Sequence, residues 1–168
     1  GQGGIIMSER YYEADAKTEA MLTTLINDRF AGLKAAKIKV LLDAKPKIDK
    51  LRGAMIFASI KLTNEVERYL SKSMDLNGLD YLIFINALCW EMASEKDKKR
   101  VLSHELRHTF IDEEGNYKLI RHDIEDFYVE IKLNEDDPMW GQSLSVIAMA
   151  KFEQMKADEK AAKAKKKG

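Results

Sequence analysis

The feature that most limits how this chain can fold is the apolar run at residues 79–87, LDYLIFINA. The run is far shorter than the roughly 20 apolar residues that span a bilayer, and no other run in the chain approaches that length. It is rich in β-branched and aromatic side chains, which favour a strand. We therefore expect a well-buried strand here.

Two further segments predict strands, and helices are expected around them. Residues 36–44 alternate in polarity, with Ile38, Val40 and Leu42 on one face. Residues 54–62 give the second strand, and residues 117–121 a short extended return after the Gly115-Asn116 turn. Helices are predicted over residues 8–31, 63–73, 94 to about 111, from Asp123 onward, and 140–158.

The length and the charge balance exclude several classes of protein. A chain of 168 residues has the size of one ordinary domain, and its 28 basic and 28 acidic residues give no net charge. A globally basic nucleic-acid binder is therefore disfavoured. The only cysteine, Cys89, excludes a disulfide framework, fits a reducing cytoplasm, and is expected to be a small buried hydrophobe. The first residues do not resemble a signal peptide, so a cytoplasmic protein without a membrane segment is expected.

All three histidines of the chain fall within a stretch of 19 residues, at positions 104, 108 and 122. The first two frame His104-Glu105-Leu106-Arg107-His108, which is the H-E-x-x-H pattern on a predicted helix. A spacing of four brings both imidazoles to one helix face, where both can reach one metal at about 2.0–2.1 Å. Glu105 is then placed beside the metal as a general base. On the other side of this helix, the residues expected to pack into the core are Leu102, Leu106, Thr109 and Phe110.

A catalytic zinc usually takes a third protein ligand, and several residues are candidates. Asp112 lies on the same helix face, but about 12 Å of helix separates it from residue 104. His122 is better placed, because the chain turns at Gly115-Asn116 and returns to it; Glu125 is the alternative. The acidic residues that follow could accept hydrogen bonds from the imidazoles; they are Asp123, Glu125 and Asp126.

The run from His104 to Thr109, followed by residues 117–127, resembles the putative phage metallopeptidase family and, more distantly, the SprT-like proteases. In those proteins H-E-x-x-H is followed by a histidine, an acidic residue and an aromatic residue. Here these places are filled by His122, by Glu125 or Asp126, and by Phe127. The strand at 79–87, followed by Trp90-Glu91, also agrees with this resemblance. The resemblance covers residues 32–135. A Cys-rich zinc extension found in some SprT-like proteases has no counterpart, because the chain has one cysteine.

The resemblance implies an α+β, zincin-like domain, in which a twisted, mostly antiparallel sheet packs against the H-E-x-x-H helix. We accordingly divide the chain into an N-terminal helical segment (1–31), a metallopeptidase domain (32–137), and a C-terminal helix with a Lys-rich tail (138–168). The implied function is hydrolysis of peptide bonds in a protein or peptide by a zinc (Zn2+) enzyme, with Glu105 activating a zinc-bound water.

Two parts of the implied active site are open at this stage. A second donor to the oxyanion could be Tyr117, Arg121 or Tyr128, or each of these could be a packing or surface residue. In zincins an extended substrate commonly lies along an edge strand, and the strand at 79–87 is the candidate for this role. The same strand could equally be a core strand that binds nothing.

A different class of function is also compatible with the sequence. The chain could be a non-catalytic binding module that a metal stabilises and that acts through a protein or DNA partner. The tail from Lys156 is rich in alanine and lysine, which is typical of a solvated helix end; contact with nucleic acid is the alternative.

Overall fold

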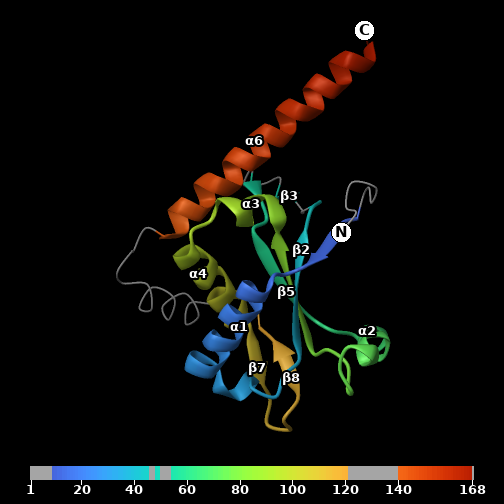
Figure 1. Cartoon of the computed structure of the whole chain (residues 1–168), viewed down its shortest axis with the longest axis vertical. Helices are drawn as coiled ribbons and strands as arrows, with labels where there is room; N and C mark the ends of the chain where they lie inside the picture. Colours follow the sequence, from blue (N-terminus) through green and yellow to red (C-terminus); the bar gives the residue numbers. More distant parts are fainter. Residues whose placement is uncertain (1–8, 46–47, 50–53, 121–139, 168) are drawn as a thin grey trace.

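The computed structural model describes residues 9–45, 48–49, 54–120 and 140–167, which form an α+β fold (Figure 1). Its main sheet has four strands in the order β1 (Tyr11–Glu13), β2 (Ile38–Asp43), β6 (Tyr81–Asn86) and β5 (Ala58–Leu62). The two outer pairings are antiparallel, and β2 runs parallel to β6. The predicted α+β class is confirmed, and the sheet is mixed.

Strand β6 corresponds to the apolar run and lies between β2 and β5. Tyr81, Ile83 and Ile85 are fully buried, as expected for the most apolar strand of the chain. Because β6 is paired on both sides, no further strand can add to it. Of the two alternatives for this strand, the edge strand that lines up a substrate is therefore wrong and the core strand is right. The edge strand next to β6 is β5.

The other two predicted strands have different outcomes. In β2, Val40 is fully buried and Ile38 and Leu42 pack against the same core, so the predicted alternation is confirmed. The segment at 54–62 is interrupted instead of forming one strand. Its first part, β4 (Ala54–Met55), pairs with β3 (Ile48–Asp49) in a separate hairpin, and only β5 joins the main sheet.

The N-terminal helix begins later than its predicted start at residue 8. Helix α1 spans Ala16–Arg29, and the carboxylate of Asp15 accepts a hydrogen bond from the backbone N–H of Thr18. This N-cap ends the extended chain before it, so that Tyr11–Glu13 can pair with β2. An ion pair secures the pairing, since Arg10 donates to both carboxylate oxygens of Asp43 over 2.9 and 3.0 Å.

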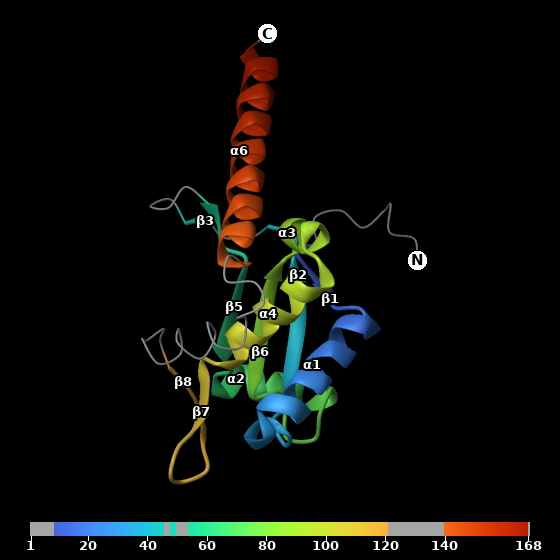
Figure 2. The same cartoon turned by 90° about the vertical axis from the view of Figure 1, so that its left-hand side faces the viewer.

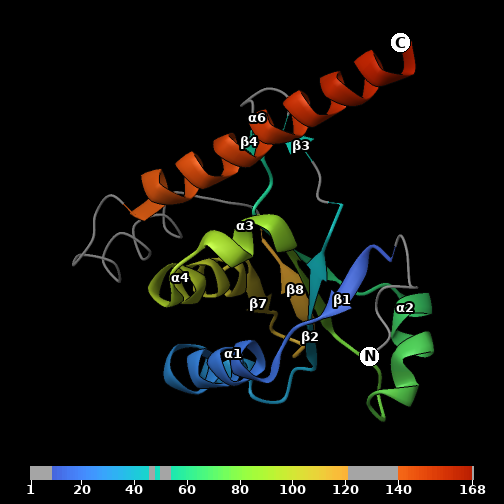
Figure 3. The same ribbon diagram turned by 45° about the horizontal axis from the view of Figure 1, so that its top comes forward.

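Helices α1 and α4 (Glu95–Leu106) cover one face of the sheet, and α2 (Glu65–Leu70) lies on its other side (Figure 3). Helix α4 begins where predicted, because the Ser94 hydroxyl accepts a hydrogen bond from the N–H of Asp97. The two covering helices bury apolar side chains against β2 and β6. The core consists of Leu22, Leu25, Leu33, Val40, Tyr81, Ile83, Ile85, Trp90, Val101, Leu102 and Leu106.

The remaining helices are shorter or peripheral. Helix α3 (Ala87–Met92) follows β6 directly and buries Cys89 and Trp90. Two 3-10 turns, η2 (Ala31–Leu33) and η3 (Ser71–Ser73), follow α1 and α2. The helix predicted from Asp123 onward lies outside the described residues.

Helix α6 (Trp140–Lys167) is nine residues longer than predicted, because alanine and lysine extend it through the tail. It packs against β4 and α3 and then projects away from the sheet (Figure 2). None of the helices that the structure describes has both the length and the apolar character required to cross a bilayer.

Candidate metal centre

Helix α4 carries the first half of the candidate site and ends at Leu106, not at residue 110 or 111 as predicted. The Thr109 hydroxyl donates a hydrogen bond to the carbonyl of Leu106 over 2.7 Å, which caps the last turn. The chain then enters β7 (Thr109–Ile111), which pairs with β8 (Tyr117–Leu119) in an antiparallel hairpin. Pairing with β8 thus replaces the predicted last turn of helix. Phe110 is 40% exposed in this hairpin, so its predicted place in the core is wrong.

The turn of this hairpin accounts for Asp112. Its carboxylate accepts hydrogen bonds from the N–H groups of Glu114 and Asn116, at 2.9 and 2.8 Å, which hold the pKa of Asp112 below its usual range. Gly115 completes the turn with a φ of 83°, which favours glycine. Asp112 therefore shapes the turn, and it does not extend the histidine face of the helix.

His108 lies in the turn between α4 and β7, and both its backbone and its ring are held by Ile120. The backbone N–H of Ile120 donates to the carbonyl of His108 over 2.6 Å. The ring atom Nδ1 of His108 lies 3.1 Å from the carbonyl oxygen of Ile120. A carbonyl oxygen can only accept, so Nδ1 carries the proton and Nε2 is the ring nitrogen suited to a metal. Metal-binding histidines commonly have this type of support.

His104, Glu105 and His108 come together as a group with the chemistry of a metal site. Their ligand atoms lie within 4.8 Å of one another, and the two imidazole rings are 5.1 Å apart at an interplanar angle of 87°. Two ligands of a tetrahedral zinc are about 3.3 Å apart, so small side-chain rotations suffice to bind one ion. Glu105 and His108 are buried, at 6% and 8% exposure, and His104 is half-buried. Imidazoles beside a carboxylate are ligands that zinc prefers, and the group fits such an ion.

A pocket of ≈ 220 Å³ connects this group to the edge of the sheet. Glu105 and His108 line one side of the pocket, and Ala58, Ser59 and Ile60 of β5 line the other. The remaining wall comes from Leu119 and Ile120. A ligand in this pocket would therefore contact the candidate metal centre and an edge strand together.

The outer edge of β5 presents backbone groups toward this pocket. The N–H of Asn86 donates to the carbonyl of Phe57, and the N–H of Thr63 donates to that of Asp80, which fixes the register with β6. The backbone N–H and C=O groups of the odd-numbered residues of β5 thus point toward β6, because hydrogen-bonded and non-bonded pairs alternate along antiparallel strands. The backbone groups of Ala58, Ile60 and Leu62 point away from β6, and no hydrogen-bond partner for them is found within the described part of the chain.

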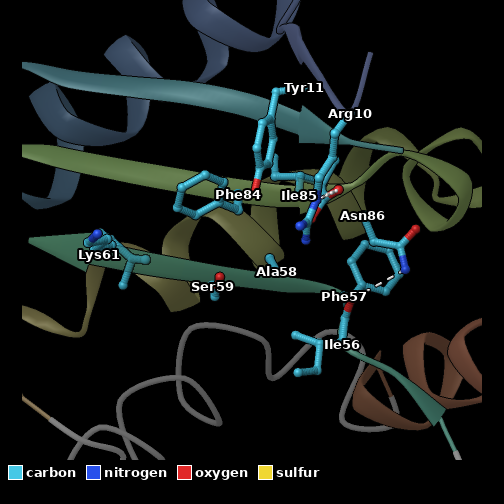
Figure 4. Close-up of a pocket in the computed structure, with 12 residues that line it drawn as sticks. Arg10, Tyr11, Ile56, Phe57, Ala58, Ser59, Lys61, Phe84, Ile85 and Asn86 are labelled. Atoms are coloured by element: carbon cyan, nitrogen blue, oxygen red, sulfur yellow. Dashed lines mark hydrogen bonds and ion pairs between the residues drawn. The ribbon is translucent and has the colours of Figure 1, made fainter. Parts of the chain in front are cut away.

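A larger cavity, of ≈ 510 Å³, lies where Tyr11 and Phe84 point, on the face of the sheet that α1 and α4 leave uncovered (Figure 4). Three of the polar side chains that line it have structural roles. Arg10 is paired with Asp43, while Asn86 caps α3 and donates to the carbonyl of Ile56 over 3.3 Å. None of the described residues that line the cavity is a histidine, so size alone does not locate the candidate metal centre.

The structure places some of the other predicted site residues and not others. Tyr117 packs edge-on against Tyr81, with ring centroids 5.8 Å apart, which is a packing role. The third-ligand candidates His122 and Glu125 lie outside the described residues, as do Arg121, Asp123, Asp126 and Tyr128. Sequence reasoning did not identify the carbonyl of Ile120 or the edge of β5, because backbone groups leave no signal in residue types.

Comparison with known proteins agrees with this geometry. The sequence matches the family model described as Putative phage metallopeptidase over residues 9–161. The chain belongs to this family. The match extends beyond the predicted span of 32–135 to include β1, α1 and most of α6. No curated protein matches the chain. Membership in the phage metallopeptidase family implies a metal and a protein substrate, in agreement with the group on α4.

Proposed function

We propose that this member of the phage metallopeptidase family is a zinc-dependent peptidase, with His104 and His108 as ligands and Glu105 as the general base. The observation that carries the proposal is the hydrogen bond from His108 Nδ1 to the carbonyl of Ile120. It places the proton on Nδ1, which makes Nε2 the ring nitrogen suited to a metal, and it is independent of the H-E-x-x-H spacing. The clustering of the three side chains within 4.8 Å supports the same conclusion.

We propose His122 as the third ligand and keep Glu125 as the alternative. Ile120 is fixed against His108, and two residues of chain reach at most about 7 Å further. We prefer His122 because the length of the chain limits its distance from Ile120 more tightly than it limits that of Glu125. A set of three imidazoles favours zinc, although other divalent metals accept the same donors.

The chain's own residues supply the proton transfers. When bound, the metal lowers the pKa of its water and polarises the scissile carbonyl. A carboxylate oxygen of Glu105 accepts the proton of the attacking water and later donates it to the leaving amine nitrogen. The burial of Glu105 limits competing contact with solvent. Ile120 holds the ring of His108 through Nδ1 and its backbone through the carbonyl, so we expect the ring to keep its orientation through the reaction.

We propose that the substrate is an extended peptide that pairs with β5. The outward backbone groups of Ala58 and Ile60 offer donors and acceptors to one further strand. The pocket beside them leads to Glu105 and His108, so a paired peptide carries its backbone past the candidate metal centre. Recognition through the backbone predicts that the segment cleaved must be extended.

The test compares Glu105→Gln with the wild type on a library of quenched fluorescent peptides. The general-base role predicts a loss of activity of about 10²–10⁴-fold, with the bound metal retained. Glu95→Gln is the matched control, because Glu95 lies in the exposed first turn of the same helix. Activity of Glu105→Gln within about tenfold of the wild type would contradict the role of Glu105 as base. A metal-loaded wild type that cleaves no peptide would instead favour the binding-module function.

A further inference from the structure

The distal part of helix α6 is an exposed arm that the peptidase chemistry does not use. Phe152 and Met155 are half-buried, whereas every residue from 156 to 166 is exposed. This part projects away from the sheet in two perpendicular views (Figures 1 and 2). Alanine and lysine have high helix propensity, which allows the arm to remain helical without packing. Core packing therefore does not explain the residue types of the arm, and its exposed side chains are available to a partner.

Three lysines of the arm share one face of the helix. Lys156, Lys160 and Lys163 are spaced by four and three residues, which places them in a single stripe about 10.5 Å long. Asp158 lies on the far side, whereas Glu159 borders the stripe, four residues before Lys163. No carboxylate in the described part of the chain forms an ion pair with any of the three lysines, although Lys156 lies over the ring of Phe152 at 5.2 Å. We call Lys156, Lys160 and Lys163 the lysine stripe.

The arm is also positively charged as a whole. It contains five lysines between residues 156 and 166 against two acidic residues, while the complete chain has no net charge. The positive charge is thus concentrated at one end of the molecule. A local field of this kind attracts a polyanion without making the whole protein basic.

The chemistry of the arm favours nucleic acid over a lipid surface. Membrane-bound helices insert an apolar face, but no side chain from 156 to 166 is more apolar than alanine. Each DNA strand presents one phosphate per about 3.4 Å of axis, so the stripe spans about three phosphates. A single helix about 10–12 Å wide fits the major groove, which is about 12 Å wide. Alanine and lysine offer little for base discrimination, so contact would be with phosphates.

We propose that the lysine stripe binds the phosphate backbone of duplex DNA without sequence preference. The site is separate from the candidate metal centre, so this inference does not depend on the proposed peptidase activity. Three phosphate contacts predict a slope of about −3 for the logarithm of affinity against the logarithm of salt concentration.

The test measures anisotropy of a labelled duplex of about 20 base pairs with the full chain across a salt series. We expect Lys160→Gln/Lys163→Gln to weaken binding about tenfold or more and to reduce the slope by about 2. The control is Lys165→Gln/Lys166→Gln, which removes the same charge from the same helix outside the stripe, and its effect should stay below about threefold. Circular dichroism checks that both variants keep the helix.

Three results would overturn the proposal. The absence of binding at low salt would exclude the contact with DNA. Equal losses in the two double variants would show a response to net charge, not to the stripe. Tighter binding to vesicles containing phosphatidylserine than to the duplex would assign the arm to a lipid surface.

Discussion

The sequence predicts correctly that His108 lies beside His104, but the structure positions it in a different way. Its spacing from His104 predicts that the two rings meet, and the rings do lie 5.1 Å apart. The predicted reason was a continuous helix, whereas His108 lies in a turn after the helix has ended. Ile120, twelve residues away, supplies the support that the helix would have given. Residue spacing could predict the group, but the carbonyl of a residue just after β8 could not be read from residue types.

Cys89 provides a prediction at the same scale. Its side chain is fully buried, and burial raises the pKa of its thiol to about 11. At about pH 8 almost no thiolate exists in the native state, so we expect no reaction with a thiol reagent such as Ellman's reagent. In denaturant, one thiol per chain should react, because the chain has a single cysteine.

The control for this measurement is a cysteine-free variant, Cys89→Ala, which should not react in either condition. Rapid labelling of the native wild type would contradict the buried, unreactive assignment of Cys89. It would also reopen a functional role for this thiol.

Strand β5 shows that strand pairing, and not the local sequence pattern, determines the position of a strand in the sheet. The apolar runs at 54–62 and 79–87 both predict strands, and each contributes one strand to the main sheet. Neither pattern specifies which strand lies at the edge, because strand order depends on pairings between distant segments. Partner choice places β6 in the centre and β5 at the edge, beside Glu105 and His108.

The edge of β5 can be tested by removing one outward N–H. Ala58→Pro deletes a donor that faces away from β6, a position that proline tolerates in edge strands. If the substrate pairs there, KM should rise several-fold while the urea midpoint stays close to that of the wild type. Peptidase kinetics and urea unfolding check the two parts of this prediction.

The neighbouring substitution Ser59→Pro is the matched control. The backbone N–H of Ser59 points toward β6 in this register, so proline removes a hydrogen bond of the sheet and should lower the urea midpoint well below that of Ala58→Pro. An unchanged KM in a folded Ala58→Pro variant would argue against pairing of the substrate with β5.

Tyr81 links the central strand to the hairpin that holds His108. Its hydroxyl donates to the carbonyl of Lys118 in β8 over 2.8 Å, and Ile120 follows two residues later. Tyr81→Phe removes this bond without leaving a large cavity, so we expect a loss of about 1 kcal/mol in the free energy of unfolding. Urea denaturation measures this loss, and an unchanged stability would contradict the anchoring role.

The same residue predicts a dependence of stability on pH. Burial raises the pKa of Tyr81 to about 12, above its ordinary value of 10.0. The native state therefore holds this proton more tightly than the unfolded state, and the associated stability is complete below pH 10.0 and is lost as pH rises towards about 12. The urea midpoint of Tyr81→Phe should fall less than that of the wild type over this range. If the urea midpoints of the two proteins fell equally with pH, the raised pKa of Tyr81 would be contradicted.

At the scale of the whole molecule, the α+β class and the buried apolar strand could be predicted, while several boundaries could not. Local capping set the true start of α1 at Asp15, and pairing with β2 drew Tyr11–Glu13 into the sheet. Helix α6 is longer than its apolar pattern because alanine and lysine sustain a helix without a core. The family match over residues 9–161 includes these N- and C-terminal elements together with the candidate metal centre.

We propose that this chain holds a catalytic metal through His104 and His108. Elemental analysis of protein purified without added metal tests it most directly, with His104→Ala/His108→Ala as the comparison and circular dichroism as the check on folding. We predict about one zinc per wild-type chain and its loss in the double variant. A folded wild type that contains no metal, and that takes up none on dialysis against zinc, would contradict the claim.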